Sequence, residues 1–241
     1  MAKRISIMIV SIPLLVKHMK IFLVFFFLLT LSNIALAFNE SHLKKLLETN
    51  ACINCDLEAV NLEGAKLINA DIRGTNLNFS VLKNVDLTNA DLSESSLWEA
   101  NLENSNLKNI NLSNANLWDA NLISVDLSYS NLTNVNLISA NLSNSVLISV
   151  NLTGADLSKS LLNGANLESA NITNADLVYT LLINTNLRNV NFSNSNLFGS
   201  NLKKAILNNT NFTNTNLRRV NFSGSNLEDA VNLEGIISDL E

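Results

Sequence analysis

Residues 115–142 read ANLWDANLISVDLSYSNLTNVNLISANL, and a leucine stands at every fifth position of this stretch. The same spacing runs from Leu57 to Leu227 through thirty-five positions, of which thirty are Leu and the others are Ile or Phe. A period of five fits neither the α-helix, with about 3.6 residues per turn, nor the β-strand, with a period of about 2. The sequence therefore predicts a stack of repeating turns.

The residues around each of these apolar positions, here called the central position, also follow a rule. The side chain two residues earlier is small in every repeat except one, where it is Ile110, and the residue immediately before is Asn or Asp in twenty-eight of thirty-five repeats. Two residues after the central position, Asn and Gly dominate, and six of the seven glycines occupy this slot. Because Gly and Asn tolerate a positive φ, the slot is predicted to be a left-handed corner. The central and small side chains should point inward and the other three outward.

This pattern resembles the pentapeptide-repeat family, whose motif is A(D/N)LXX. Segments such as Ala115-Asn116-Leu117 and Ala155-Asp156-Leu157 match the motif in full. The resemblance implies an all-β fold, a right-handed quadrilateral parallel β-helix (a solenoid) with four pentapeptides, or twenty residues, per coil. Residues 55–229 would then form nearly nine coils, a rod roughly 40 Å long at about 4.8 Å per coil. The fold by itself does not specify a function.

The N-terminal segment, residues 1–37, has a different composition. It contains four basic residues and no acidic one, an apolar run from Ile21 to Leu29, and the ending Ala35-Leu36-Ala37. These features are typical of a secretory signal peptide cleaved after Ala37, with Met19 as a possible true start. We therefore expect a secreted or periplasmic protein without stable membrane insertion. The alternative is an uncleaved membrane anchor, although the apolar run is shorter than the roughly 20 residues that a span needs.

Residues 38–54 are predicted to form an N-terminal capping helix and a junction. Leu43, Leu46 and Leu47 fall on one face of a helix over residues 39–49, and Asn39 or Ser41 could cap its start. Such a helix would close the open end of the solenoid, which needs a cap because each coil is stabilised only by its neighbours.

At the other end, residues 230–241 are predicted to form a C-terminal cap. Val231-Asn232-Leu233 is displaced by one residue from the five-residue spacing, which indicates the end of the repeats. A short helix could place Ile236, Ile237 and Leu240 over the last coil.

The two cysteines, Cys52 and Cys55, form a CxxC pair at the junction. A thioredoxin-like redox pair would need a βαβ context that the sequence lacks, and a zinc site would need two more ligands, of which only His42 is nearby. We favour a structural role, either a disulfide formed after export or two buried thiols.

The sequence does not predict an enzyme, a cofactor or a metal site. His42 is the one histidine after residue 37, and no base is spaced to activate a Ser or Thr hydroxyl. Carboxylates such as Asp86, Asp91 and Asp126 occupy the polar slot before the central residue, where stacked hydrogen bonding is the expected role.

A row of bulky apolar residues is predicted on the outside of the rod. Positions twenty apart share a wall, so residues directly after the central position can be read along it. A contiguous apolar patch of this kind marks an interface more often than isolated apolar residues do. We therefore expect binding to an unknown protein partner or self-association, unless terminal segments cover the row or its spacing is coincidental. The candidate interface residues are Trp98, Trp118, Ile138, Val178, Tyr179, Leu181, Ile183 and Phe198.

Another wall carries Ser or Thr in the same slot, from Ser93 to Thr213, with Asn beside it. A flat Ser/Thr–Asn array could bind a glycan or ice, which gives an alternative function of a different class. The competing interpretation is a hydrogen-bonded ladder that suits the turn type.

The resemblance implies a third alternative, because acidic members of the pentapeptide-repeat family can mimic the DNA duplex and inhibit topoisomerases. The distribution of charge bears on this alternative. Without residues 1–37 the chain has 12 basic and 21 acidic residues, a net charge of −9. A duplex mimic needs an extended surface of one sign. Here residues 56–126 carry eleven acids and four bases, whereas the last coils are basic. An exported protein would also not meet a topoisomerase, so no nucleic acid or nucleic-acid enzyme is expected as partner.

Overall fold

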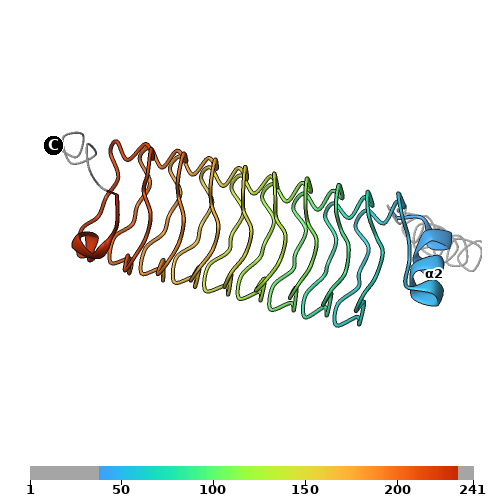
Figure 1. Cartoon of the computed structure of the whole chain (residues 1–241). Helices are drawn as coiled ribbons and strands as arrows, with labels where there is room; N and C mark the ends of the chain where they lie inside the picture. The colour runs from blue at the N-terminus through green and yellow to red at the C-terminus, as the bar shows by residue number, and fades with distance from the viewer. Residues whose placement is uncertain (1–37, 233–241) are drawn as a thin grey trace, which may run out of the picture. The chain divides into compact units, whose positions relative to one another are not determined.

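The computed structural model describes residues 38–232, which all lie in one compact unit. They form a rod of stacked coils (Figure 1). Parallel β-bridges join residues that are twenty apart, from Ala51↔Asp71 to Asn211↔Val231. The fold is therefore a parallel β-helix, as predicted, and each coil holds four pentapeptides. The predicted signal peptide, residues 1–37, and residues 233–241 of the predicted C-terminal cap lie outside the described residues.

Each pentapeptide is one short bridge followed by one tight corner. The corner residue, two positions after the central one, is left-handed from Ala59 to Gly224, for example at Asn114 (φ 58°) and Gly154 (φ 70°). The sequence predicted Asn or Gly in this slot, but bulky residues also occupy it, including Phe79 (φ 59°) and Tyr179 (φ 57°). The strain of a left-handed residue is local, so the regular hydrogen bonding of adjacent coils can outweigh it.

The core is a set of apolar columns inside the coils. Leu102, Leu122 and Leu142 are at most 1% exposed, which confirms that the five-residue row faces inward. Three phenylalanines, Phe192, Phe212 and Phe222, take the place of Leu near the C-terminal end, where the rings of Phe192 and Phe212 stack with centroids 5.5 Å apart. Burial of these columns is the main source of stability, because it removes a large apolar area from water in every coil.

The Asn or Asp before a central position makes two kinds of hydrogen bond. Its Oδ1 accepts the backbone N–H of the residue two positions later, as in Asp126 with Ser128 (3.0 Å). Many of the Asn side chains also donate to the equivalent residue one coil earlier, as Asn131 does to Asn111 (3.0 Å). Stacked hydrogen bonding was the role predicted for this slot, and it explains why Asn and Asp are so frequent there.

Helix α2, Glu40–Thr49, precedes the first coil (Figure 1). Asn39 is its N-cap, because its side chain accepts the N–H groups of Ser41 and His42, and Asn50 ends the helix in the left-handed conformation. Leu46 is fully buried against the core, as the helical pattern predicted. Leu47 is 61% exposed, so the expectation that it packs with Leu46 was wrong.

The helix segment satisfies backbone groups at the edge of the first coil. The N–H of Asp56 donates to Nδ1 of His42 (2.9 Å), and the carbonyl of Asp56 accepts the N–H of Asn39 (3.1 Å). Asn50 donates its side-chain amide to the carbonyl of Ile68 (2.8 Å). These bonds replace those that an earlier coil would have made, which is the physical task of a cap.

At the C-terminal end a 3-10 turn, η1 (Leu227–Asp229), interrupts the last regular coil. The bridge pattern resumes beyond it, because Val231 pairs with Asn211. The sequence placed a one-residue slip at residues 231–233, but the backbone keeps its twenty-residue register up to Val231, and Asn232 is exposed and left-handed (φ 59°). Backbone pairing with the preceding coil overrides the side-chain pattern at this point.

Cys52 and Cys55 form a disulfide at the start of the first coil. Both residues are buried, at 0% and 4% exposure. The disulfide closes a very short loop, for which the loss of unfolded-chain entropy gives about 2 kcal/mol of stabilisation.

We expect Cys52→Ala combined with Cys55→Ala to lower the free energy of unfolding by about 2 kcal/mol. Urea unfolding followed by circular dichroism would measure it. A reductant should destabilise the wild type by a similar amount and leave the double variant unchanged. An equal response of both proteins to the reductant would contradict a structural disulfide.

Candidate interaction surface

The predicted apolar row lies on one wall of the rod. Five of its residues stand directly after a central position and share one column, and we call them the apolar stripe: Trp98, Trp118, Ile138, Val178 and Phe198. Their coils are consecutive except for the one carrying Ser158. The indole rings of Trp98 and Trp118 stack with centroids 5.3 Å apart and planes inclined by 19°. The spacing between coils matches the contact distance of aromatic rings, so adjacent coils build a continuous surface.

Phe79 extends the stripe toward the N-terminal end, and the sequence analysis missed it. Its ring lies 4.8 Å from that of Trp98, with planes inclined by 56°, and the residue is 40% exposed. Phe79 occupies a corner slot, so it does not share the wall position of Trp98. The available signal was a large aromatic residue where Asn or Gly is usual.

The C-terminal half of the stripe contains a second aromatic group. The ring of Tyr179 meets that of Phe198 edge-on at 5.8 Å. A Cβ at Gly199 would lie 2.5 Å from Tyr179, so the glycine leaves room for the tyrosine ring. The guanidinium of Arg219 lies 5.5 Å from the centre of the Phe198 ring, within reach of a cation–π contact.

Leu181 and Ile183 belong to the neighbouring wall, as the sequence indicated. Leu181 bridges to Leu161 in the adjacent coil, and both side chains are half-buried. Ile183 is also half-buried, and its N–H donates to Asn163 (3.1 Å). Leu181 and Ile183 form an apolar border beside Tyr179 rather than a separate patch.

The stripe is less exposed than the sequence analysis expected. Only Trp118 (40%) and Tyr179 (50%) of the eight predicted residues are exposed, and the others are half-buried. Large side chains on adjacent coils cover one another, which lowers their accessible area without moving them inside. The Nε1 of Trp98 is buried and has no hydrogen-bond partner among the described residues.

In the acidic half of the rod, residues 56–126, lysine side chains form ion pairs with neighbouring carboxylates. Lys83 pairs with Glu103 (2.9 Å) and Lys108 with Asp126 (3.0 Å). The hydrogen bond to Glu103 raises the pKa of Lys83. Within residues 38–232, the corner residues Glu99 and Asp119 form no ion pair. These two free carboxylates flank the tryptophans of the stripe.

The Ser/Thr wall is an internally bonded ladder. The hydroxyls of Thr133, Thr153, Ser193 and Thr213 each donate to the Asn Oδ1 two residues earlier. Asn side chains of the next coil in turn donate to these hydroxyl oxygens, as Asn171 does to Thr153 (3.0 Å). At these four positions the hydroxyl hydrogens are therefore already used within the wall.

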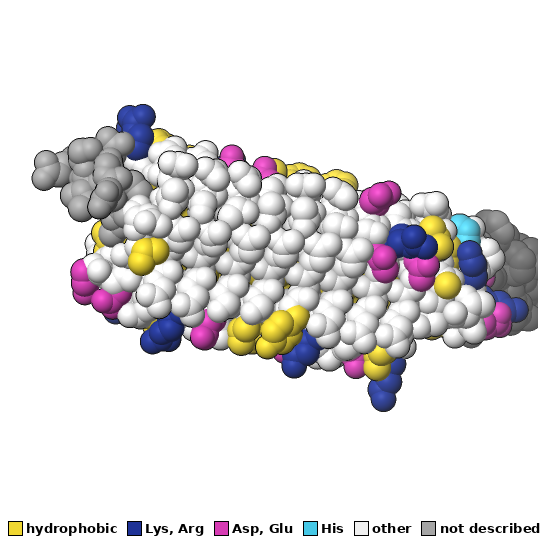
Figure 2. All heavy atoms as spheres, viewed as in Figure 1, with side chains coloured by type: hydrophobic (Ala, Val, Ile, Leu, Met, Phe, Trp, Pro, Cys, Tyr) yellow, Lys and Arg dark blue, Asp and Glu magenta, His cyan; other side chains and the backbone are white. Residues whose placement is uncertain are grey.

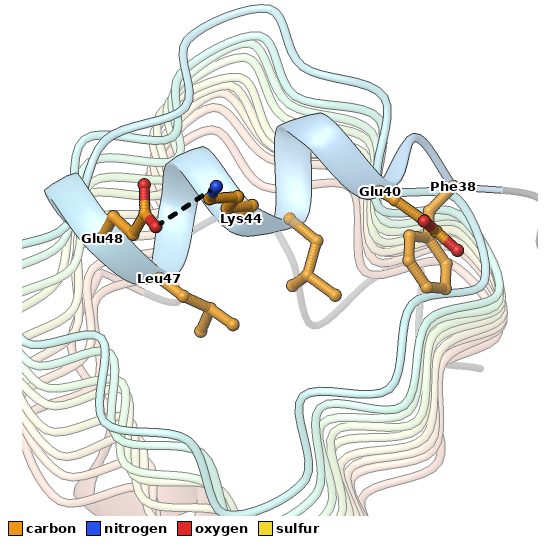
Figure 3. Close-up of a pocket in the computed structure, with 6 residues that line it drawn as sticks. Phe38, Glu40, Lys44, Leu47 and Glu48 are labelled. Atoms are coloured by element: carbon orange, nitrogen blue, oxygen red, sulfur yellow. Dashed lines mark ion pairs between the residues drawn. The ribbon is translucent and has the colours of Figure 1, made fainter.

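An open groove of about 460 Å³ lies along α2 (Figure 3). Phe38 and Leu47 point to the same side of the helix, and Lys44 forms an ion pair with Glu48 (3.8 Å). The lining contains three apolar residues, Phe38, Leu43 and Leu47, and three charged ones, Glu40, Lys44 and Glu48. His42, the candidate zinc ligand, instead accepts the N–H of Asp56.

Residues 38–232 also show neither a metal site nor a membrane span. In this part of the chain, no cluster of three or more His, Cys, Asp or Glu side chains could hold a metal ion. None of its helices has the length and apolarity needed to cross a membrane. On the face shown in Figure 2, hydrophobic side chains emerge in small patches on a mainly uncharged surface.

Several solved structures resemble this chain. HetL, a pentapeptide repeat protein involved in heterocyst differentiation regulation from the cyanobacterium Nostoc sp. strain PCC 7120, is 27% identical over 80% of this chain and 96% of its own, with a TM-score of 0.44. Rfr23 from the cyanobacterium Cyanothece 51142 is 24% identical over 80% and 97%, with a TM-score of 0.23. QnrB1, a plasmid-mediated fluoroquinolone resistance protein, is 17% identical over 78% and 94%, with a TM-score of 0.42. No match was found among curated proteins.

The family model for pentapeptide repeats matches eight copies in this chain. The matches cover residues 55–93, 90–128, 100–137, 126–164, 165–203 and 195–231, which is nearly the whole coiled region. The repeat inferred from the five-residue spacing, the buried central residues and this match agree. The chain belongs to the pentapeptide-repeat family.

Proposed function

We propose that this protein is an exported, non-catalytic scaffold that binds another protein through the apolar stripe. The observation that supports the proposal is the stacked pair Trp98–Trp118 on the outside of a rigid rod, extended by Phe79. Aromatic residues in a contiguous patch are the groups most often responsible for binding energy at protein interfaces. The rod holds them at fixed spacing, so binding requires little ordering of the surface.

Export is the second part of the proposal. It is supported by the composition of residues 1–37 and by the disulfide Cys52–Cys55, which suits an oxidising compartment. A C-terminally tagged full-length chain should be found outside the cytoplasm, with a mature N-terminus at Phe38. Retention of the tagged protein in the cytoplasm would contradict export and would reopen the DNA-mimic alternative.

The finer architecture also belongs to the proposal. We infer a right-handed quadrilateral rod of nearly nine coils, from the family resemblance and the twenty-residue bridges. A crystal structure with the opposite hand would contradict it.

We expect Trp98→Asp combined with Trp118→Asp to abolish association, because two carboxylates would replace the largest apolar contact of the stripe. The measurement is sedimentation velocity together with co-purification from the exported fraction. Circular dichroism should show an intact rod, since both side chains lie outside the coils. Ser113→Asp with Thr133→Asp, in the same slot of another wall, is the matched control and should associate normally. Unchanged association of the tryptophan variant would refute the proposal.

A further inference from the structure

We infer that the partner bound by the stripe is a second copy of this chain, laid face to face and antiparallel. This inference rests on the proposed function, because it uses the same stripe. It names the occupant and the orientation, which the stripe alone does not give.

The wall that carries the stripe has opposite charges at its two ends. Glu99 and Asp119 lie at the corners beside the two tryptophans, and Arg218 and Arg219 follow the coil of Phe198. None of these four charged groups forms an ion pair within residues 38–232. Residues 177–227 contain five bases and no acid, so the basic end is not neutralised by its surroundings. Two unpaired charged ends of opposite sign favour an antiparallel pair.

A two-fold axis between the coils of Ile138 and Ser158 matches the two halves of the stripe. The axis lies in the plane of contact and perpendicular to the rod, so both copies present the same wall. Because every coil has the same length, one matched coil brings all the others into register. The facing residues of the two copies are then Trp98 with Phe198, Trp118 with Val178, and Ile138 with Ser158.

Arg219 is already placed for this arrangement. Its guanidinium lies over the ring of Phe198, 5.5 Å from the centroid, so the cation sits one coil before its own backbone. In the antiparallel pair, the coil of Phe198 faces the coil of Trp98 and Glu99. The guanidinium of one copy therefore meets the free carboxylate of the other at the edge of the apolar contact.

Between the coils of Phe79 and Arg218, the three other charged groups on this wall do not oppose the pairing. Asp156 and Asp176 occupy the polar slot, and each accepts the N–H of the residue two positions later (2.9 and 3.0 Å). Lys159 occupies a corner. In this register the side chains that face the three charged groups are uncharged: Asn136, Asn116 and Ser139.

A parallel pair lacks this complementarity. With the two-fold axis along the rod, each residue lies at the height of its own equivalent. Glu99 and Asp119 of one copy would then lie at the same height as the same carboxylates of the other, so the two acidic ends would be side by side. The arginines would be opposed in the same way. Charge therefore selects the antiparallel orientation.

The small size of the contact and its solvent-exposed charged edges indicate weak association. Eight coils at about 4.8 Å each give an interface roughly 38 Å long. Its total buried area falls at the low end of specific interfaces, near about 1,200 Å². We therefore expect a reversible dimer with a Kd in the micromolar range.

The experiment is a charge exchange, read by sedimentation equilibrium in low salt. We expect Glu99→Lys with Asp119→Lys to weaken dimerisation at least about tenfold, and Arg218→Glu with Arg219→Glu to do the same. Combining all four substitutions in one chain should restore the wild-type Kd, because each end again faces the opposite charge. Mixing the two double variants should give a heterodimer about as tight as the wild type, because both basic ends of one variant face acidic ends of the other. Arg188→Glu with Lys203→Glu, on other walls, is the matched control and should leave dimerisation unchanged.

The outcomes separate this inference from the proposed function. A monomeric wild type, or a quadruple variant as weak as the double variants, would overturn the antiparallel dimer. If the wild type is monomeric but captures another protein, and Trp98→Asp with Trp118→Asp abolishes the capture, the proposed function stands without this inference. If the stripe substitutions affect neither, both are wrong.

Discussion

Leu142→Asp is expected to unfold the rod. Leu142 is fully buried among the central residues of neighbouring coils, so the new carboxylate would have neither water nor a cation beside it. Burial of an unpaired charge and loss of the Leu contacts together exceed about 4 kcal/mol, which is a large share of the stability of a typical domain. Because each coil contacts only its neighbours, a defect in the middle also separates the two halves of the stack.

The measurement is solubility and far-ultraviolet circular dichroism of the purified variant. Leu161→Asp is the matched control, because Leu161 pairs with the same coil but occupies the outward polar slot, where Asp is common. The control should fold and melt near the wild-type temperature. A soluble Leu142→Asp rod with a wild-type melting curve would show that this row does not form the core.

Phe192→Ala should lower the free energy of unfolding by about 3–5 kcal/mol. Phe192 is fully buried, and its ring stacks on Phe212 at 5.5 Å with planes inclined by 2°. Truncation leaves a cavity the size of a benzene ring in a closed column, and the coils cannot collapse into it because their backbones are held by hydrogen bonds on both sides.

Urea unfolding would give the loss for Phe192→Ala. Phe198→Ala is the control on the outside of the neighbouring segment, and it should cost about 1 kcal/mol or less because its slot opens to solvent. Equal losses for the two variants would contradict the assignment of inside and outside positions.

Most of the architecture follows from the spacing of residue types along the sequence. Leu102, Leu122 and Leu142 could be placed inside, and the corner slots identified, because every repeat experiences the same environment as the next. The number of residues per coil did not follow from the period of five. It came from the family resemblance, and the bridges between residues twenty apart bear it out.

The stripe was predicted only in part. Trp98 and Trp118 were assigned to one wall by comparing residues twenty apart, but Phe79 lies nineteen residues before Trp98 and was not found by that comparison. Tyr179 and Phe198 have the same nineteen-residue relation. The corner rings of Phe79 and Tyr179 lean over the next coil, so their contacts fall outside the column to which their positions belong.

The sequence by itself determined which side chains point inward, where the coils turn, and that a helix precedes them, because these depend on spacing and on local backbone preference. Only the tertiary structure decided which outward side chains meet, how far they are covered, and where Arg219 places its charge. The reason is physical: residues in a repeat share a backbone environment, whereas contacts on the outside depend on the size and direction of side chains that adjacent coils bring together.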